Sequence, residues 1–109
     1  MSLYFPEENE GSVHQIFPGV QIRTLPASEM MLSLVTMQPN SVVQPHSHPH
    51  EQVGMVVEGS AIFCIGGEEK VLGKGAMYRI PSGVRHEVKA LESGAVALDI
   101  FHPVRQDYL

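Results

Sequence analysis

The sequence predicts an all-β fold, an antiparallel sandwich or small barrel, and three observations lead to this fold class. Ten glycines and eight prolines are scattered along the 109 residues, so no uninterrupted window remains for a long amphipathic helix. The segments between these residues are short and rich in β-branched, aromatic and other apolar residues, as strands are. They also recur every ~8–12 residues, a spacing typical of antiparallel sandwiches and barrels.

Seven apolar segments have the length of a strand. In chain order they cover residues 20–25, 30–37, 52–57, 60–65, 76–80, 86–91 and 95–101. An eighth segment, 68–72, follows Gly66-Gly67, and this pair predicts a hairpin because both central turn positions can adopt positive φ. Two further glycine-containing pairs separate neighbouring segments, Glu58-Gly59 and Ser93-Gly94.

The composition is that of one ordinary globular domain, with 43% hydrophobic and 17% charged residues. We expect a single domain over residues 13–109, preceded by an N-terminal arm over 1–12. A chain of this length buries roughly two-thirds of its unfolded surface, which is enough for a core without a metal or disulfide staple. The net charge of −5, with seven Lys and Arg, leaves no basic stripe for a phosphate backbone and excludes nucleic acid as the expected partner.

The first ten residues, MSLYFPEENE, contain no basic region followed by an apolar one, and no segment approaches the length of a membrane span. The expected location is therefore cytoplasmic, with no membrane partner. Leu3, Tyr4 and Phe5 are apolar residues in an otherwise polar arm and predict a homodimer, because such patches are commonly covered by a partner. Cys64 has no second cysteine to pair with and is expected to be a buried, inert thiol in an apolar run.

Two segments carry histidines in a pattern that suits a metal. In the extended segment Pro45-His46-Ser47-His48-Pro49, residues two apart face the same side, so two imidazoles can point at one place. The second segment, 75–86, is a strand and a Pro/Gly corner that ends in His86. Three imidazoles and a side-chain oxygen suit a first-row divalent transition metal.

These segments resemble the paired motifs of the cupin superfamily, G-x5-H-x-H-x(3,4)-E-x6-G and G-x5-P-x-G-x2-H-x3-N. Seven positions match at fixed spacing: His46, His48, Gly59, Gly75, Pro81, Gly83 and His86. The resemblance implies the cupin double-stranded β-helix, a jelly-roll-like small barrel. It also implies one divalent transition metal per chain, Ni, Fe, Mn, Co or Zn, inside one end of the barrel.

Two departures from the cupin pattern bear on the predicted ligands. Gln52 replaces the usual Glu, and Ala90 replaces the final Asn. The neighbouring Glu51 is an alternative ligand, but strand alternation turns it to the opposite face once Gln52 points inward. The expected ligands are therefore His46, His48, Gln52 and His86. Because this set is neutral, the metal's charge stays uncompensated, which favours a small anionic substrate.

The C-terminal segment resembles the ending of the small pectin-degradation cupins of the KdgF type, and Asp99, Phe101 and Arg105 carry this similarity. The resemblance implies an enzyme that opens and ketonises 4,5-unsaturated monouronates released from pectin or alginate. Asp99 would carry the proton, Arg105 would pair with the substrate carboxylate or hydroxyls, and Phe101 would form an apolar wall.

Several alternatives remain open from the sequence. A three-histidine site also suits a metal-dependent dioxygenase, and a cupin that binds a small molecule without transforming it is a third possibility. Which of Tyr78 and Arg79 points into the barrel is undecided. We expect His50 either at the rim or in contact with a metal ligand, we expect His14 at the surface, and the role of His102 stays open.

Overall fold

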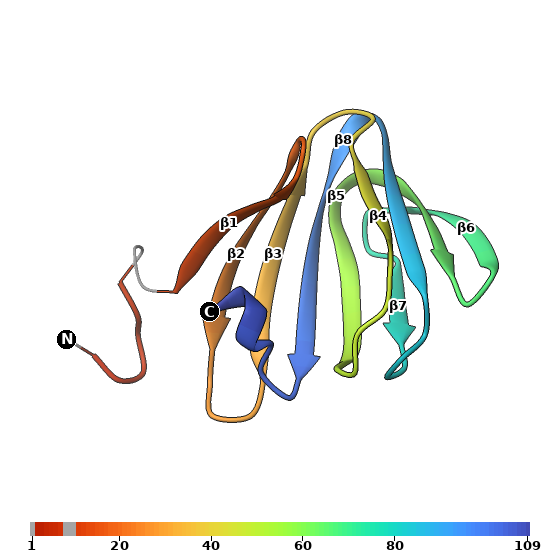
Figure 1. The fold of residues 1–109 in the computed structure, drawn as a ribbon. Helices are drawn as coiled ribbons and strands as arrows, with labels where there is room; N and C mark the ends of the chain where they lie inside the picture. The colour runs from red at the N-terminus through yellow and green to blue at the C-terminus, as the bar shows by residue number, and fades with distance from the viewer. Residues whose placement is uncertain (1, 8–10) are drawn as a thin grey trace.

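The computed structural model describes residues 2–7 and 11–109, and it is built almost entirely of antiparallel β-strands (Figure 1). The strands are β1 (Ser12–Phe17), β2 (Val20–Pro26), β3 (Met31–Met37), β4 (Val42–His46), β5 (Glu51–Ile65), β6 (Glu68–Gly73), β7 (Met77–Ile80) and β8 (His86–His102). A short 3-10 helix, η1 (Gln106–Tyr108), follows β8. The predicted all-β class is confirmed. Of the arm predicted over 1–12, residues 1 and 8–10 lie outside the described residues, and Ser12 already belongs to β1.

The strands form one eight-stranded sheet in the order β1-β2-β3-β8-β5-β6, with β4 beside β8 and β7 beside β5. The two long strands, β5 and β8, pair with each other on both sides of a bend. On one side of the bend β8 lies between β3 and β5, and on the other side it lies between β4 and β5. The sheet therefore folds over itself into two walls around a common interior (Figure 1).

The bend corrects the expectation of four separate strands within 52–65 and 86–101. Segments 52–57 and 60–65 belong to the continuous strand β5, and segments 86–91 and 95–101 belong to β8. Gly59 and Gly94, which were expected to separate these segments, lie within the two strands. Gly59 and Gly94 both have positive φ, 73° and 74°. A Cβ on Gly59 would collide with the carbonyl of Gly94, so the two glycines let β5 and β8 bend against each other without breaking.

Other local predictions had mixed outcomes. The Gly66-Gly67 hairpin is confirmed, because both glycines have positive φ and Ile65 pairs with Glu68 across the turn. Cys64 is only partly buried, since strand alternation puts it on the face of β5 opposite to the buried Ala61 and Phe63. No helix in the described part of the chain is long and apolar enough to cross a membrane.

Side chains alternate strictly between the two faces on β2 and β3, and the inward ones form successive rows across the sheet. The outer row consists of register partners Met31, Phe101, Gln52 and Ile80. The middle row, two residues further along each strand, consists of Thr24, Ser33, Asp99, Gly54 and Tyr78. The inner row consists of Ile22, Val35, Ala97 and Val56 and belongs to the apolar core. The middle row is thus a polar layer between two largely apolar ones.

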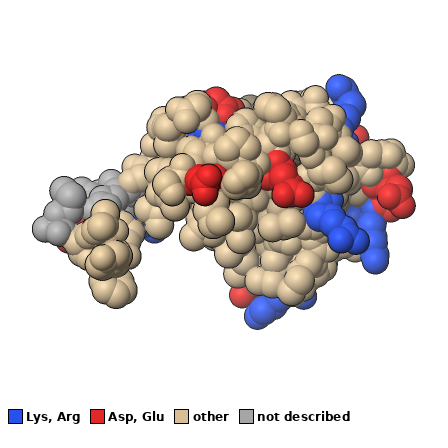
Figure 2. All heavy atoms as spheres, turned by 90° about the horizontal axis from the view of Figure 1, so that it is seen from below, with Lys and Arg blue, Asp and Glu red and all other residues tan. Residues whose placement is uncertain are grey.

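The C-terminal segment closes the interior near the outer row. The carbonyl of Tyr108 accepts hydrogen bonds from Thr24 Oγ1 and His14 Nε2, each at 3.1 Å. His14 is therefore half-buried and joins the two ends of the chain, whereas the sequence suggested a surface residue. Seen from below, this end of the molecule is mostly uncharged, with acidic and basic side chains in small separate groups (Figure 2).

Candidate metal centre

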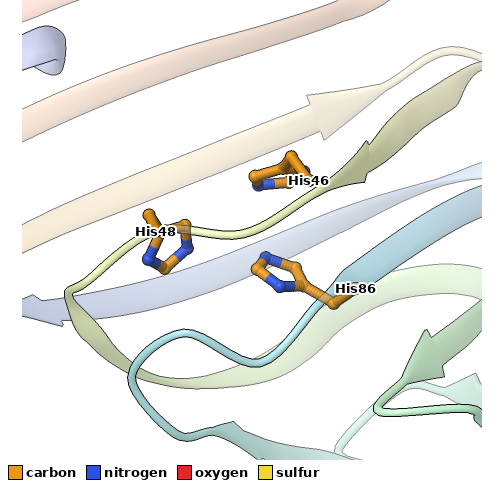
Figure 3. Close-up of side chains that lie close together, drawn as sticks. All are labelled: His46, His48 and His86. Carbon is orange, nitrogen blue, oxygen red and sulfur yellow. The ribbon is translucent and has the colours of Figure 1, made fainter.

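Three histidines from two segments of the chain lie close together (Figure 3). His46 ends β4 and His86 begins β8, and the two are register partners. His48 lies in the connection to β5. The ring centroids of His46 and His86 are 4.2 Å apart, and those of His48 and His86 are 5.0 Å apart. One ring nitrogen from each histidine lies within 4.8 Å of the others, which is close enough to share one ion.

The backbone sets the tautomer of all three rings. Each Nδ1 donates to a carbonyl oxygen two residues away, over 2.8 Å from His46 to Gln44, 3.1 Å from His48 to His50 and 2.9 Å from His86 to Val84. A neutral imidazole that donates from Nδ1 keeps a lone pair on Nε2. In the neutral form of each ring, the free lone pair is therefore on Nε2. Metal-binding histidines commonly donate their other ring N–H to a carbonyl in this way, which fixes the orientation of the ring.

Gln52 supplies an oxygen beside this cluster. Its side chain is buried, and its Oε1 lies 3.1 Å from His48 Nε2, whereas Glu51 on the opposite face is exposed. Burial, helped by the charge of Arg105, lowers the pKa of His48 to about 4, so this imidazole is neutral at pH 7. Its proton sits on Nδ1, so Nε2 and Oε1 present two lone pairs to the same space. This arrangement suits a divalent cation with three nitrogen ligands and one oxygen ligand.

Asp99 lies in the middle row, next to Gln52, and it is a buried carboxyl group. The Tyr78 hydroxyl donates to its Oδ1 at 2.5 Å, and the Gln52 amide donates to the same carboxyl group. Burial raises the pKa of Asp99 to about 6, while these hydrogen bonds and Arg105 oppose the rise. Burial and the neighbouring carboxylate raise the pKa of Tyr78, so its hydroxyl stays protonated and remains a donor.

This contact gives a physical reason for glutamine at position 52. An amide can turn its oxygen to His48 and its N–H to Asp99 at the same time. A glutamate there would set a second negative charge against Asp99, and it would have no hydrogen to donate.

Gly54 is the reason that Tyr78 and Asp99 can meet. It pairs with both residues across the sheet, and a Cβ at Gly54 would collide with Asp99 Oδ1 and with the Tyr78 phenol. The phenol and the carboxylate thus occupy the space that any other residue at position 54 would fill.

Arg105 is held from three sides. Its guanidinium carbon lies 3.8 Å from the ring centroid of Tyr108 and 5.0 Å from that of Phe101. Its Nε and Nη2 donate to the Asp107 carboxylate at 3.2 Å and 2.7 Å. Arg105 is 7% exposed, whereas Arg79 and Arg85 are exposed on the surface. A guanidinium that is fixed in place and is part of the cavity wall suits recognition of an anion.

One cavity joins these groups. Its wall includes His46, His86, Gln52, Asp99, Phe101 and Arg105, which the sequence singled out, and Ser33, Tyr78 and Tyr108, which it did not assign. His48 does not belong to this wall, and its ring centroid lies 5.6 Å from that of Phe101. His102 is exposed, and His50 packs 5.5 Å behind the ring of His48. The unassigned wall residues carry no motif: the inward direction of Ser33 and Tyr78 follows only from strand parity and register, and Tyr108 lies in η1.

Known proteins resemble this chain in both sequence and structure. The cupin domain family matches residues 33–101. The pectin degradation protein KdgF of Dickeya dadantii strain 3937 is 31% identical over 111 residues, which cover 100% of both chains. Oxalate decarboxylase OxdC of Bacillus subtilis strain 168 is 32% identical over 88 residues, which are 75% of this chain but 23% of that protein.

Two solved structures share the whole fold. KdgF from Halomonas sp. superposes with a TM-score of 0.86 at 30% identity, covering 96% of this chain and 97% of that one. An RmlC-like cupin from Shewanella frigidimarina gives a TM-score of 0.88 at 28% identity, covering 99% and 97%. The match of the cupin domain over most of the chain and the full-length similarity to KdgF lead to one conclusion: this chain belongs to the cupin family.

Proposed function

We propose that this cupin is a metal-dependent enzyme that opens and ketonises 4,5-unsaturated monouronates from pectin or alginate. One observation carries the proposal: the buried carboxyl group of Asp99 lines the same cavity as His46 and His86 of the histidine cluster and as Arg105. The full-length similarity to two proteins named KdgF, one of them described as a pectin degradation protein, supports the substrate class.

The reaction is an internal rearrangement that needs no oxidant. A base removes the proton of the anomeric hydroxyl, the bond between the anomeric carbon and the ring oxygen breaks, and an aldehyde forms. The ring oxygen leaves as an enolate, and a proton delivered to C4 turns the enolate into a ketone. One proton is lost and one is gained, so a single acid/base group can serve both steps.

Asp99 is suited to that role. Its carboxylate is fixed by the Tyr78 hydroxyl and the Gln52 amide, so it can meet a substrate proton without searching rotamers. A pKa of about 6 lies close to neutral pH, where a group can both accept and return a proton.

His46, His48, Gln52 and His86 would hold one divalent transition metal, since their lone pairs converge as described above. When bound, the ion would supply Lewis-acid stabilisation of the negative charge that develops on the ring oxygen. The neutral ligand set leaves this positive charge available to an anionic substrate.

Arg105 and Phe101 would bind the substrate. The Asp107 carboxylate fixes Arg105 in the cavity wall, where its guanidinium would take the substrate carboxylate. Phe101 is 3% exposed and contributes an apolar wall of the cavity against which a sugar ring can lie.

The test is the loss of ultraviolet absorbance of the unsaturated monouronate, together with metal analysis of the purified protein. We expect loss of absorbance that stops with a chelator, returns when a divalent metal is added, and is accompanied by no oxygen consumption. Oxygen uptake would indicate a dioxygenase, and binding of the uronate without any change in absorbance would indicate a binding cupin. Either result would contradict the proposal.

A further inference from the structure

The middle row contains a hydroxyl group with no partner. Ser33 is 0% exposed, and within the described residues its Oγ makes no hydrogen bond. A buried hydroxyl without a partner is costly, so its presence calls for a cause such as a bound ligand or water. The other atom of this kind, His50 Nδ1, belongs to a residue that is not part of the cavity wall, whereas Ser33 is part of it.

The other hydroxyls of the row are already occupied. Thr24 Oγ1 donates to the carbonyl of Tyr108, and the Tyr78 hydroxyl donates to Asp99. Ser33 lies on β3, where it pairs with Thr24 of β2 on one side and with Asp99 of β8 on the other. Inward side chains of such register partners have their Cβ atoms ~5 Å apart, so one ligand oxygen can reach both Ser33 and Asp99.

We propose that Ser33 is a specificity-determining residue whose hydroxyl binds a hydroxyl group of a sugar acid at the position next to Asp99. The proposal rests on the proposed function only for the ligand class, a hydroxylated carboxylic acid. Ser33 forms no bond with the reacting atoms. A hydrogen bond between the buried Ser33 hydroxyl and the ligand hydroxyl aligns the ligand. A ligand that lacks the matching hydroxyl leaves the Ser33 hydroxyl without a hydrogen-bond partner.

The test compares two serine variants in the metal-loaded protein. Ser33→Ala removes the unpaired hydroxyl. Ser41→Ala is the matched control, because Ser41 is also buried but lies outside the cavity wall and donates to the Gln38 carbonyl at 2.7 Å. The probes are D-galacturonate and its monodeoxy analogues, titrated by calorimetry, and melting temperature is measured alongside.

The two variants should behave in opposite ways. Ser33→Ala should weaken D-galacturonate binding roughly tenfold and leave the melting temperature unchanged or higher, since it removes a polar group without breaking a bond. Ser41→Ala should lower the melting temperature and leave binding within about twofold of wild type. One monodeoxy analogue should bind wild type as weakly as Ser33→Ala binds the parent acid, and Ser33→Ala should not distinguish the two ligands.

Three results would overturn the inference. These are unchanged binding in Ser33→Ala, a fall in its melting temperature that indicates a structural water or hydrogen bond, and failure of wild type to bind D-galacturonate. Failure of the proposed function gives a different pattern. In that case wild type would leave the unsaturated uronate unopened, while the binding difference between the two serine variants would persist.

Discussion

Asp99 is the residue on which the proposed chemistry depends, and an isosteric substitution isolates its role. Asp99→Asn keeps the shape of the side chain but cannot take up a proton. We expect turnover of the unsaturated uronate to fall by about 100-fold or more. Metal content should stay near the wild-type value, because the three histidines are untouched. Wild-type turnover in this variant would exclude Asp99 as the proton carrier.

Gln52 contacts both the histidine cluster and Asp99, so Gln52→Glu should separate metal binding from turnover. The carboxylate retains an oxygen for the metal and adds negative charge, so metal occupancy should be equal or higher. The same charge faces Asp99 and removes its hydrogen-bond donor, so turnover should fall by at least about tenfold. Metal analysis and the absorbance assay on one preparation check both outcomes, and loss of the metal would contradict this description of Gln52.

At the scale of single strands, the sequence predicts which segments are extended better than it predicts where one strand ends and the next begins. Gly66-Gly67 was predicted as a turn and is one, because adjacent positive-φ residues reverse the chain locally. Gly59 and Gly94 carry the same signal but lie within continuous strands, because each permits close approach of the other strand at a bend. That distinction depends on a partner more than thirty residues away and cannot be read from either segment alone.

The candidate site shows the same division. His46, His48 and His86 follow from motif spacing, and Asp99 and Arg105 follow from a resemblance in the C-terminal segment. Tyr78, Gly54 and Ser33 enter the site only through cross-strand register, so the sequence left them undecided or unmentioned. Two strands, β1 and β4, were also missed, the second because Pro45 interrupts its pattern.

Gly54 gives an element-scale prediction with a matched control. Gly54→Ala places a methyl group against Asp99 and Tyr78, so it should displace that pair, lower turnover and cost ~1–3 kcal/mol of stability. Gly73→Ala adds the same group at the end of β6, where nothing lies within 4 Å, so turnover should not change. Thermal unfolding and the absorbance assay measure both effects. Equal turnover and equal stability of the two variants would show that the contact between Tyr78 and Asp99 does not contribute to activity.

At the scale of the whole molecule, the fold should survive loss of the metal. The buried apolar cluster includes residues from β2, β3, β4, β5, β6 and β8 and none of the proposed metal ligands. Chelation, or His48→Ala, should therefore abolish metal occupancy but leave a cooperative unfolding transition, with stability reduced only by the lost binding energy. Circular dichroism during heating tests this expectation, and an apo protein without a cooperative transition would contradict it.

The outer face of the sheet leads to the prediction of a homodimer. Leu32 is 40% exposed and is flanked across the strands by Leu25 and Ile100, each 37% exposed, and Val53 continues the row at 45%. A contiguous apolar strip across four strands is well suited to a second copy of the chain. Light scattering should give twice the 12.0 kDa chain mass at micromolar concentration. Leu32→Glu should reduce that mass to one chain, whereas Val71→Glu on β6 should not, and a wild-type monomer would refute the prediction.

The position of the second half of β8 has a consequence for how the protein is made. A ribosome that has released residues up to about 90 has already produced all three histidines of the cluster, yet β3 and β5 still lack the strand that lies between them. Asp99, Arg105 and the Tyr108 carbonyl, which binds Thr24 and His14, emerge after that point. During synthesis the chain can therefore expose the three histidines before it has Asp99 or a closed cavity. Because its central strand arrives late and joins segments distant in sequence, final closure should be the slow step of folding.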